Sequence, residues 1–209
     1  MAGLYFHIPF CKRVCAYCDF YKSVELDRME PLAEAMRREL EARRDYLGGE
    51  PVRTRYFGGG TPSLCPPETI GGLLARAAEL FDCSAVEETT LEANPDDLTP
   101  EYLAALRRAG IDRLSIGVQS FDDDCLKLMN RRGDGAFLKA LFARLRAGIP
   151  GLVIRTSLIT GLPGEGEKEF AELCDFLREE RLERVGAFAF SPEEGPPAAK
   201  MEHVDTDSA

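Results

Sequence analysis

The segment YFHIPFCKRVCAYCDF, residues 5–20, carries three of the seven cysteines of the chain in one short run. Cys11, Cys15 and Cys18 have the spacing C-x3-C-x2-C. One loop can aim three such thiolates at a single metal centre, and thiolates are the usual ligands of iron–sulfur clusters. A cubane cluster has four irons, so one iron would keep an open position for a substrate or cofactor.

A zinc site is the alternative for the same loop, with His7 or Cys65 as the fourth ligand. The other cysteines are scattered, and an odd total fits no closed disulfide framework. We predict that these four are small buried hydrophobic residues, with an auxiliary ligand role as the alternative. They are Cys65, Cys83, Cys125 and Cys174.

The 209 residues suit one large domain with a substantial core. Lys and Arg number 26 against 36 Asp and Glu, a net charge of −10, so no cationic field favours nucleic acid as a partner. No stretch approaches the roughly 20 apolar residues of a membrane-spanning helix, and the first residues lack the parts of a signal peptide. The sequence therefore predicts a cytoplasmic protein without a membrane partner.

Short β-branched or aromatic runs alternate with segments of helical period, which is the pattern of βα units around a parallel sheet. Six such units are too few for a closed eight-stranded barrel, so we predict an α/β fold of the partial (βα)6 TIM-like barrel type over residues 1–192. Residues 193–209 lack periodicity and are predicted to be a disordered tail. The predicted strands are 4–8, 52–57, 86–92, 113–118, 152–159 and 185–190.

The predicted helices show apolar stripes and end signals. The first runs from about 31 to 47 and is closed by Gly48-Gly49, and the second opens at Pro66-Pro67-Glu68. Thr99 is the predicted N-cap of the third, which ends at Gly110. Apolar spacing marks two further helices, around residues 137–145 and 170–177.

Polar or glycine motifs follow several of the predicted strands. The carboxyl ends of parallel barrel strands meet at one mouth, so these motifs should converge. Each has an ordinary alternative: the glycine run could be a turn, Glu92 a solvated strand end, Gln119 a helix cap and Arg131 a surface charge. The motifs are Gly58-Gly59-Gly60-Thr61, Glu92, Gln119, and the pair Arg155 and Ser157 on strand five.

The C-x3-C-x2-C loop, with the aromatic Tyr17 just before its third cysteine, resembles the signature of the radical S-adenosylmethionine (SAM) superfamily. The resemblance implies that Cys11, Cys15 and Cys18 hold a [4Fe-4S] cluster and that SAM chelates the open iron. An electron from the cluster would then cleave SAM to methionine and a 5′-deoxyadenosyl radical. The superfamily fold, a partial (βα)6 barrel, agrees with the count of units.

Within the superfamily, residues 4–124 resemble the oxygen-independent coproporphyrinogen oxidases, especially their haem-chaperone-like branch. The matching segments are YFHIPFC, CAYCDF, YFGGGTPSL, TLEANPDDLT and RLSIGVQSFDDD. Asp19-Phe20 stands where the oxidases carry a further cysteine, which argues against the oxidase itself. The resemblance implies cofactor contacts by Tyr5, Tyr17, Gly58, Gly59, Gly60, Thr61, Glu92, Gln119 and Arg131.

Residues 126–201 are instead similar to the methylthiotransferases that modify ribosomal protein or transfer RNA. The matching segments are LKLMNRRGDGAFLKALFARLR, IRTSLITGLPGEGEKEF and ERVGAFAFSPEEGPPAA. On this resemblance the fifth-strand contact to SAM is made by Ser157, with Arg155 beside it. The chain thus reads as a hybrid of two branches.

The main hypothesis is a radical SAM enzyme core that binds the cluster and SAM and cleaves SAM reductively, supplied by an electron donor such as a flavodoxin or ferredoxin. One alternative is a non-catalytic, haem-chaperone-like module that holds the cluster and SAM without turnover. Another is a methylthiotransferase-like core. The residues do not identify a substrate, which could be a small molecule or a protein.

Overall fold

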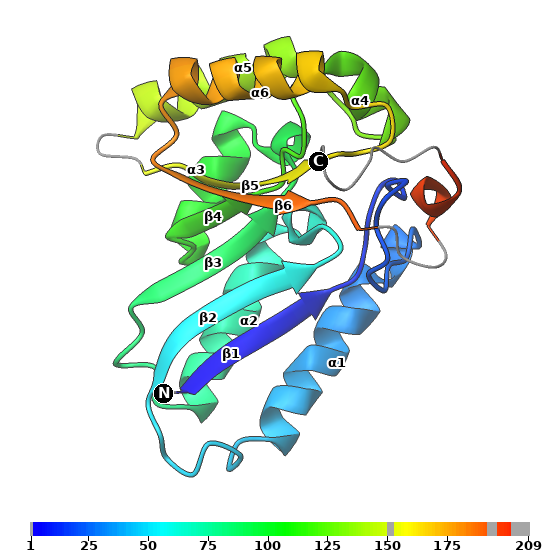
Figure 1. Ribbon diagram of the computed structural model, residues 1–209. Coiled ribbons are helices and arrows are strands. Elements are labelled where there is room, and N and C mark those ends of the chain that lie inside the picture. The colour runs from blue at the N-terminus through cyan, green and yellow to red at the C-terminus, as the bar shows by residue number, and fades with distance from the viewer. Residues whose placement is uncertain (1, 150–152, 192–195, 202–209) are drawn as a thin grey trace. The chain divides into compact units, whose positions relative to one another are not determined.

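A computed structural model describes residues 2–149, 153–191 and 196–201 (Figure 1). The chain forms two compact units, each treated below by itself. The first unit comprises Met1–Lys12 and Phe20–Ser115, and the second comprises Arg13–Asp19 and Ile116–Ala209. The boundary falls inside the cysteine segment, so Cys11 belongs to the first unit while Cys15 and Cys18 belong to the second.

The first unit is built on a four-stranded sheet in the order β1-β2-β3-β4, with parallel pairing of β1 with β2 and of β2 with β3. A helix follows each of the first three strands, as the βα pattern predicts. The elements are β1 (Ala2–Ile8), α1 (Met29–Ala42), β2 (Val52–Gly59), α2 (Pro67–Leu80), β3 (Glu88–Ala93), α3 (Pro100–Ala109) and β4 (Arg113–Ile116).

One face of this sheet forms the core with the helices. Phe6 and Phe57 stack with ring centroids 4.5 Å apart, and both are buried. Leu40 of α1, Leu73 of α2 and other apolar side chains of the three helices pack in the same cluster. Successive strand residues point to opposite faces, so the intervening residues of β1 and β2 lie on the other, more polar face. This alternation separates the core from the residues that carry chemistry.

The end signals of α3 and the start of α2 are confirmed. The Thr99 side chain accepts a hydrogen bond from the backbone N–H of Tyr102 at 3.2 Å, and Gly110 ends α3 with a φ of 102°. The predicted end of α1 is wrong, because the helix stops at Ala42. Gly48 and Gly49 do have positive φ, but they lie in turns beyond the helix.

The second unit contains the parallel strands β5 and β6 and three helices. Its core is apolar and aromatic: Phe121 stacks on Phe176 with centroids 3.3 Å apart, and Phe142 packs beside them. The first helix was not predicted from the sequence; the side chain of its N-cap, Asp122, accepts a hydrogen bond from Cys125 N at 2.7 Å. The elements are α4 (Asp123–Leu128), α5 (Gly135–Gly148), β5 (Arg155–Thr160), α6 (Glu167–Glu180) and β6 (Arg184–Ala189).

Each of the six predicted strands overlaps an observed strand in the described part of the chain. Strand five begins at Arg155 rather than at 152, and residues 150–152 lie outside the described residues. Short 3-10 helices lie between the main elements. They are η1 (Leu26–Arg28), η2 (Pro62–Leu64), η3 (Pro95–Asp97) and η4 (Pro197–Lys200).

The segment predicted as a disordered tail contains η4, in which Ala198 is buried and donates its backbone N–H to the Ala16 carbonyl at 3.1 Å. For residues 197–200 a helical turn thus replaces the predicted disorder. Residues 193–195 and 202–209 lie outside the described residues, and for them the tail stays a prediction. Separately, none of the helices in the described ranges has the length and apolar character needed to cross a bilayer.

Within the second unit, an ion pair joins Arg146 of α5 to Glu183, the residue just before β6. Arg146 Nη1 donates to Glu183 Oε1 at 2.8 Å, and the backbone N–H of Ile154 donates to Glu183 Oε2 at 2.8 Å. The guanidinium and then the N–H lower the pKa of Glu183 from 4.5 to about 2. The ionised carboxylate therefore stabilises the fold above its ordinary pKa, and this contribution is lost as the pH falls toward about 2.

We expect Glu183→Gln to lower the free energy of unfolding at pH 7 more than at pH 3. At pH 3 the unfolded wild type binds a proton at Glu183 that the folded protein does not yet bind, so the wild type has already lost most of this contribution. Urea denaturation at both pH values measures the difference in free energy of unfolding between the wild type and each variant, called the gap here. Glu179→Gln is the control, since Glu179 makes an exposed ion pair with Lys139 at 3.3 Å, and its effect should be small at both pH values. An equal gap for Glu183→Gln at pH 7 and pH 3 would contradict the prediction.

Candidate metal and cofactor site

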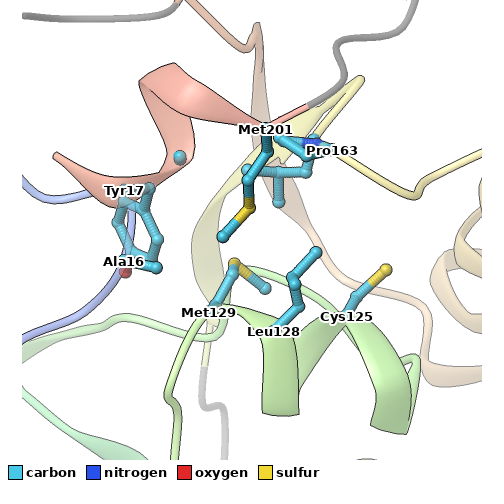
Figure 2. Close-up of a pocket in the computed structure, with 9 residues that line it drawn as sticks. Ala16, Tyr17, Cys125, Leu128, Met129, Pro163 and Met201 are labelled. Atoms are coloured by element: carbon cyan, nitrogen blue, oxygen red, sulfur yellow. The ribbon is translucent and has the colours of Figure 1, made fainter.

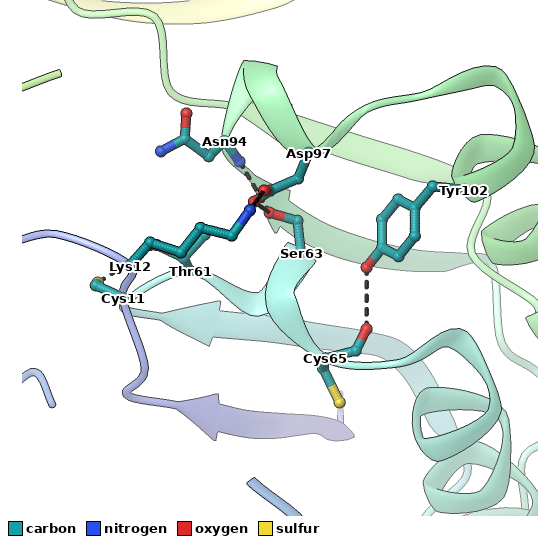
Figure 3. Close-up of polar contacts among 8 residues, drawn as sticks. All are labelled: Cys11, Lys12, Thr61, Ser63, Cys65, Asn94, Asp97 and Tyr102. Atoms are coloured by element: carbon teal, nitrogen blue, oxygen red, sulfur yellow. Dashed lines mark hydrogen bonds and ion pairs between the residues drawn. The ribbon is translucent and has the colours of Figure 1, made fainter. Parts of the chain in front are cut away.

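Cys11 lies where the loop after β1 meets the loop after β2 (Figure 3). Thr61 donates its hydroxyl to Cys11 Sγ at 3.3 Å, and Cys11 N donates to the Ser23 carbonyl at 2.9 Å. A Cβ at Gly60 would stand 2.8 Å from the Pro9 carbonyl group and 2.9 Å from Cys11 Sγ. Only glycine allows this approach, so Gly60 brings the second loop against the first cysteine.

The N–H groups of the glycine run are used within the protein. Gly59 N donates to Glu92 Oε2 at 3.1 Å, and Gly60 N donates to the Ile8 carbonyl at 2.8 Å. Both of these N–H groups therefore hold neighbouring strands and loops together, and the predicted cofactor contact of the glycine run stays a prediction. Gly58 also serves packing, because a Cβ there would lie 2.9 Å from the Tyr5 and Tyr56 rings.

Glu92, at the end of β3, is not a solvated strand end. The half-buried carboxylate accepts from Tyr56 Oη at 2.7 Å as well as from Gly59 N. Burial and the hydrogen bond to this carboxylate raise the pKa of Tyr56 to about 12. Tyr5 stacks on Tyr56 with centroids 6.0 Å apart and contacts His7 Nδ1 through its hydroxyl at 3.1 Å. Tyr5, Tyr56 and Glu92 thus form one polar and aromatic surface in the first unit.

Sequence reasoning missed the polar contacts beside this surface. Lys12 Nζ lies 2.6 Å from Asp97 Oδ1, and Ser63 donates its hydroxyl to Asp97 Oδ2 at 2.7 Å (Figure 3). Ser63 in turn accepts from Asn94 N at 3.0 Å. The only sequence signals were the position of Lys12 next to Cys11 and the position of Asp97 just after the third strand.

The second unit holds the rest of the cysteine segment. Ala16 N donates to the Met129 carbonyl at 3.1 Å, which attaches the segment to the end of α4. The guanidinium of Arg131 points at Cys15 Sγ, 4.0 Å away, and donates to the Gly117 carbonyl. Burial raises the pKa of Tyr17, the residue before Cys18. Arg131 is half-buried and contacts the cysteine segment, so it is not merely a surface charge.

Gln119 and Ser157 also lie close to each other in the second unit. Gln119 forms an isolated bridge with Leu158 and has a φ of 77°, and its side chain folds back over Gly117. Gln119 does not cap α4, because Asp122 does. Ser157 lies on the exposed face of β5.

Arg155 lies on that face as well, but it is the first residue of β5. At about 3.3 Å rise per residue, its backbone stands roughly 16 Å from Thr160, where the strand runs into the following loop. The predicted site lies at the carboxyl ends of the strands, whereas Arg155 lies at the opposite end of β5. The bridge partner of Gln119 on β5 is Leu158, three residues after Arg155.

A small apolar pocket lies in the second unit beside the cysteine segment (Figure 2). Met129 and Met201 point into it from opposite sides, and Tyr17 borders it. Its volume of about 10 Å³ is close to the space of one water molecule. The pocket is too small for an organic substrate. The remaining lining residues are Ala16, Cys125, Leu128, Leu162, Pro163 and Ala198.

The donor set of the loop fits an iron–sulfur cluster, because it offers three cysteines in one short run. All seven cysteines are described, and each is a thiol rather than part of a disulfide. No three His, Cys, Asp or Glu side chains of the described chain come close enough to hold one metal ion. Burial raises the pKa of Cys65 to about 12, which disfavours it as a zinc ligand.

The prediction of small buried hydrophobic cysteines is confirmed for Cys65 and Cys125, while Cys83 and Cys174 are half-buried. Tyr102 donates its hydroxyl to the Cys65 carbonyl at 3.0 Å, so Cys65 also helps to hold α3 (Figure 3). Neither Cys65 nor Cys125 belongs to the cysteine segment. They contribute to packing rather than to the candidate site.

We expect Gly60→Ala to destabilise the protein by about 1–3 kcal/mol, because the new methyl group meets backbone and a cysteine sulfur below 3.0 Å. Chemical denaturation gives the free energy of unfolding. Gly72→Ala on α2 is the matched control: its nearest contact is an ordinary 3.7 Å to Arg37, so the better helix propensity should stabilise by up to about 1 kcal/mol. Equal changes in the free energy of unfolding for the two substitutions would show that the close contacts of Gly60 do not contribute to stability.

The structure closely matches that of coproporphyrinogen III oxidase (HemN) from Escherichia coli, a radical SAM enzyme. The TM-score is 0.87 with 27% sequence identity, over 99% of this chain and 49% of that chain. This match confirms the α/β fold of the partial (βα)6 TIM-like barrel type.

Two curated relatives represent the two branches expected from the sequence. Heme chaperone HemW of Mycobacterium tuberculosis is 34% identical over 203 residues, which are 95% of this chain and 52% of the relative. Ribosomal protein uS12 methylthiotransferase RimO of Anaeromyxobacter is 52% identical over 111 residues, which are 52% of this chain and 24% of the relative. The chain thus spans about half of the length of HemW. The Radical SAM superfamily model matches residues 5–177, and the chain belongs to this superfamily.

Proposed function

We propose that the chain binds a [4Fe-4S] cluster through Cys11, Cys15 and Cys18, binds SAM beside it, and cleaves SAM reductively. The observation that carries this proposal is the superfamily match over residues 5–177, which includes the whole C-x3-C-x2-C loop. The donor set supports it, because three thiols stand in one loop and none is in a disulfide. When bound, the cluster supplies the electron that splits SAM into methionine and a 5′-deoxyadenosyl radical.

The side chains around the cysteines favour thiolates. The Thr61 hydroxyl donates to Cys11 Sγ, and the Arg131 guanidinium points at Cys15 Sγ. A hydrogen-bond donor and a nearby cation both stabilise a sulfur that carries negative charge. We therefore assign Thr61 and Arg131 to the support of the ligands, and Arg131 need not be a direct SAM contact.

Glu92 is the residue that we assign to the amine of SAM. Its hydrogen-bond donors, Tyr56 and Gly59 N, are neutral, and the two carboxylate oxygens have capacity for a further donor. Tyr5 presents an exposed ring beside it, with 59% of its surface accessible. Gln119 and Ser157 are the remaining polar candidates for SAM, from the second unit.

An electron donor must complete the reaction, and we propose a flavodoxin or a ferredoxin in this role. Both carry single electrons, as the reductive cleavage of one SAM requires. The substrate that receives the radical, a small molecule or a protein, stays outside this proposal. The measured reaction is therefore the formation of 5′-deoxyadenosine without added substrate.

We expect anaerobic reconstitution with iron and sulfide to load one [4Fe-4S] cluster, and the reduced protein to convert SAM to 5′-deoxyadenosine. Iron and sulfide analysis, electron paramagnetic resonance and mass spectrometry of the product measure these results. Cys15→Ala should abolish both cluster and product, because only two thiolates of the loop remain.

Cys83→Ala is the matched control, since Cys83 is also half-buried but lies far along the chain from the loop. It should leave the iron content and the rate unchanged. A cluster-loaded wild type that forms no 5′-deoxyadenosine would overturn the catalytic part of the proposal. Zinc in place of iron and sulfide would overturn all of it.

A haem-chaperone-like module without turnover is the second candidate, supported by the identity of 34% to HemW over 203 residues. Haem titration of the cluster-loaded protein separates it from the main proposal. Saturable haem binding together with no product from SAM would favour the second candidate. Product from SAM without haem binding would favour the enzyme.

A methylthiotransferase-like core is the third candidate, supported by the identity of 52% to RimO over 111 residues. The relative acts on ribosomal protein uS12, as its name states. Incubation of the reduced protein with SAM and uS12, followed by intact-mass measurement of uS12, tests this candidate. An unchanged mass while 5′-deoxyadenosine accumulates would exclude it.

A further inference from the structure

One buried carboxylate, that of Asp97, joins the loops that follow three neighbouring strands. Its side chain is 4% exposed and contacts Lys12 Nζ at 2.6 Å and Ser63 Oγ at 2.7 Å (Figure 3). Lys12 comes from the loop after β1, Ser63 from η2 after β2, and Asp97 itself from η3 after β3. All three residues belong to the first unit.

Lys12 directly follows Cys11, so the ion pair acts on the loop next to the first cysteine. Ser63 stands two residues after Thr61, whose hydroxyl donates to Cys11 Sγ. Asp97 is therefore connected to Cys11 in two ways. Lys12, which pairs with Asp97, is the next residue after Cys11, and Ser63, which donates to Asp97, lies in the same segment as Thr61, which donates to Cys11 Sγ. A change at Asp97 would reach the sulfur through both.

The cost of separating these loops is electrostatic. A buried carboxylate that loses a cation and a hydroxyl donor keeps its desolvation penalty but loses the two contacts that offset it, so the paired arrangement is preferred. Lys12 is 40% exposed, which leaves the cation end of the pair at the surface and the anion end inside. The buried Asp97 fixes the position of the loops, and the more exposed Lys12 can be substituted with less disturbance of the core.

We propose that Asp97 is a positioning residue for the first cluster ligand: through Lys12 and Ser63 it sets the place of Cys11 before any cluster is loaded. The role in cluster binding rests on the proposed function above. The preset position itself is a property of the protein without a cluster. It lowers the ordering that the loop must undergo when the cluster binds.

Hydrogen exchange of the cluster-free protein tests the preset position. Lys12→Met should speed amide exchange several-fold in residues 9–13 and 94–98, while Lys12→Arg, which keeps charge and reach, should restore protection. Lys127→Met is the matched control, because Lys127 pairs with Asp124 at 3.0 Å with both side chains exposed, and it should leave these segments unchanged. Unchanged exchange in Lys12→Met would overturn the proposal without any reference to the cluster.

Reconstitution then tests the effect on the cluster. Lys12→Met should load less iron and sulfide than the wild type, and Lys12→Arg should load normally. In Asp97→Asn the Lys12 cation stays without its anion, so the midpoint potential of the remaining cluster should move to more positive values, and the double variant Lys12→Met/Asp97→Asn should move back. A loss of stability alone would not reverse in the double variant.

The outcomes separate this inference from the proposed function. A wild type that loads the cluster and cleaves SAM, with normal cluster content and potential in every variant, would overturn the role of Asp97 and leave the enzyme intact. A wild type without a cluster would overturn the enzyme. The exchange result would then still decide whether Asp97 presets Cys11.

Discussion

The parallel pairing of β1 with β2 is the constraint on which the candidate site depends. The register runs from Ala2 opposite Val52 to Ile8 opposite Gly59, so both strands end at the same level. A slip by one residue would turn Tyr5 into the core and Phe6 out of it. It would also separate Gly60 from Cys11. Packing on the core face therefore determines the register, and the register determines which polar residues meet where β1 and β2 end.

The fold was largely predictable, because its elements depend on local periodicity. Short β-branched or aromatic runs marked β1 and β2, and Thr99 and Gly110 marked both ends of α3. Boundaries that depend on other parts of the chain were missed. Helix α1 stops at Ala42 although helix-forming residues continue, and α4 has only six residues, too few for a visible apolar stripe. Tertiary packing decides such short or frayed segments.

The candidate site was predictable by residue type but not by pairing. The cysteine spacing and the glycine run are local patterns, whereas Lys12 and Asp97 are 85 residues apart and no pattern links them. The glycine run shows the same limit. Glycine indicates that two groups approach closely, but the sequence did not say that the partners would be Pro9 and Cys11 rather than a ligand. Only the strand register identifies the partner.

Two carboxylates of the first unit, Glu92 and Asp97, differ in their partners. This difference is the basis for assigning one to cofactor binding and the other to positioning of a loop. Asp97 lies against the Lys12 ammonium, whose positive charge offsets the negative charge of the carboxylate. Glu92 is held by Tyr56 and a backbone N–H, which are neutral donors that orient the carboxylate without cancelling its charge. This difference is why we assign the cationic amine of SAM to Glu92 and the positioning of the loop to Asp97.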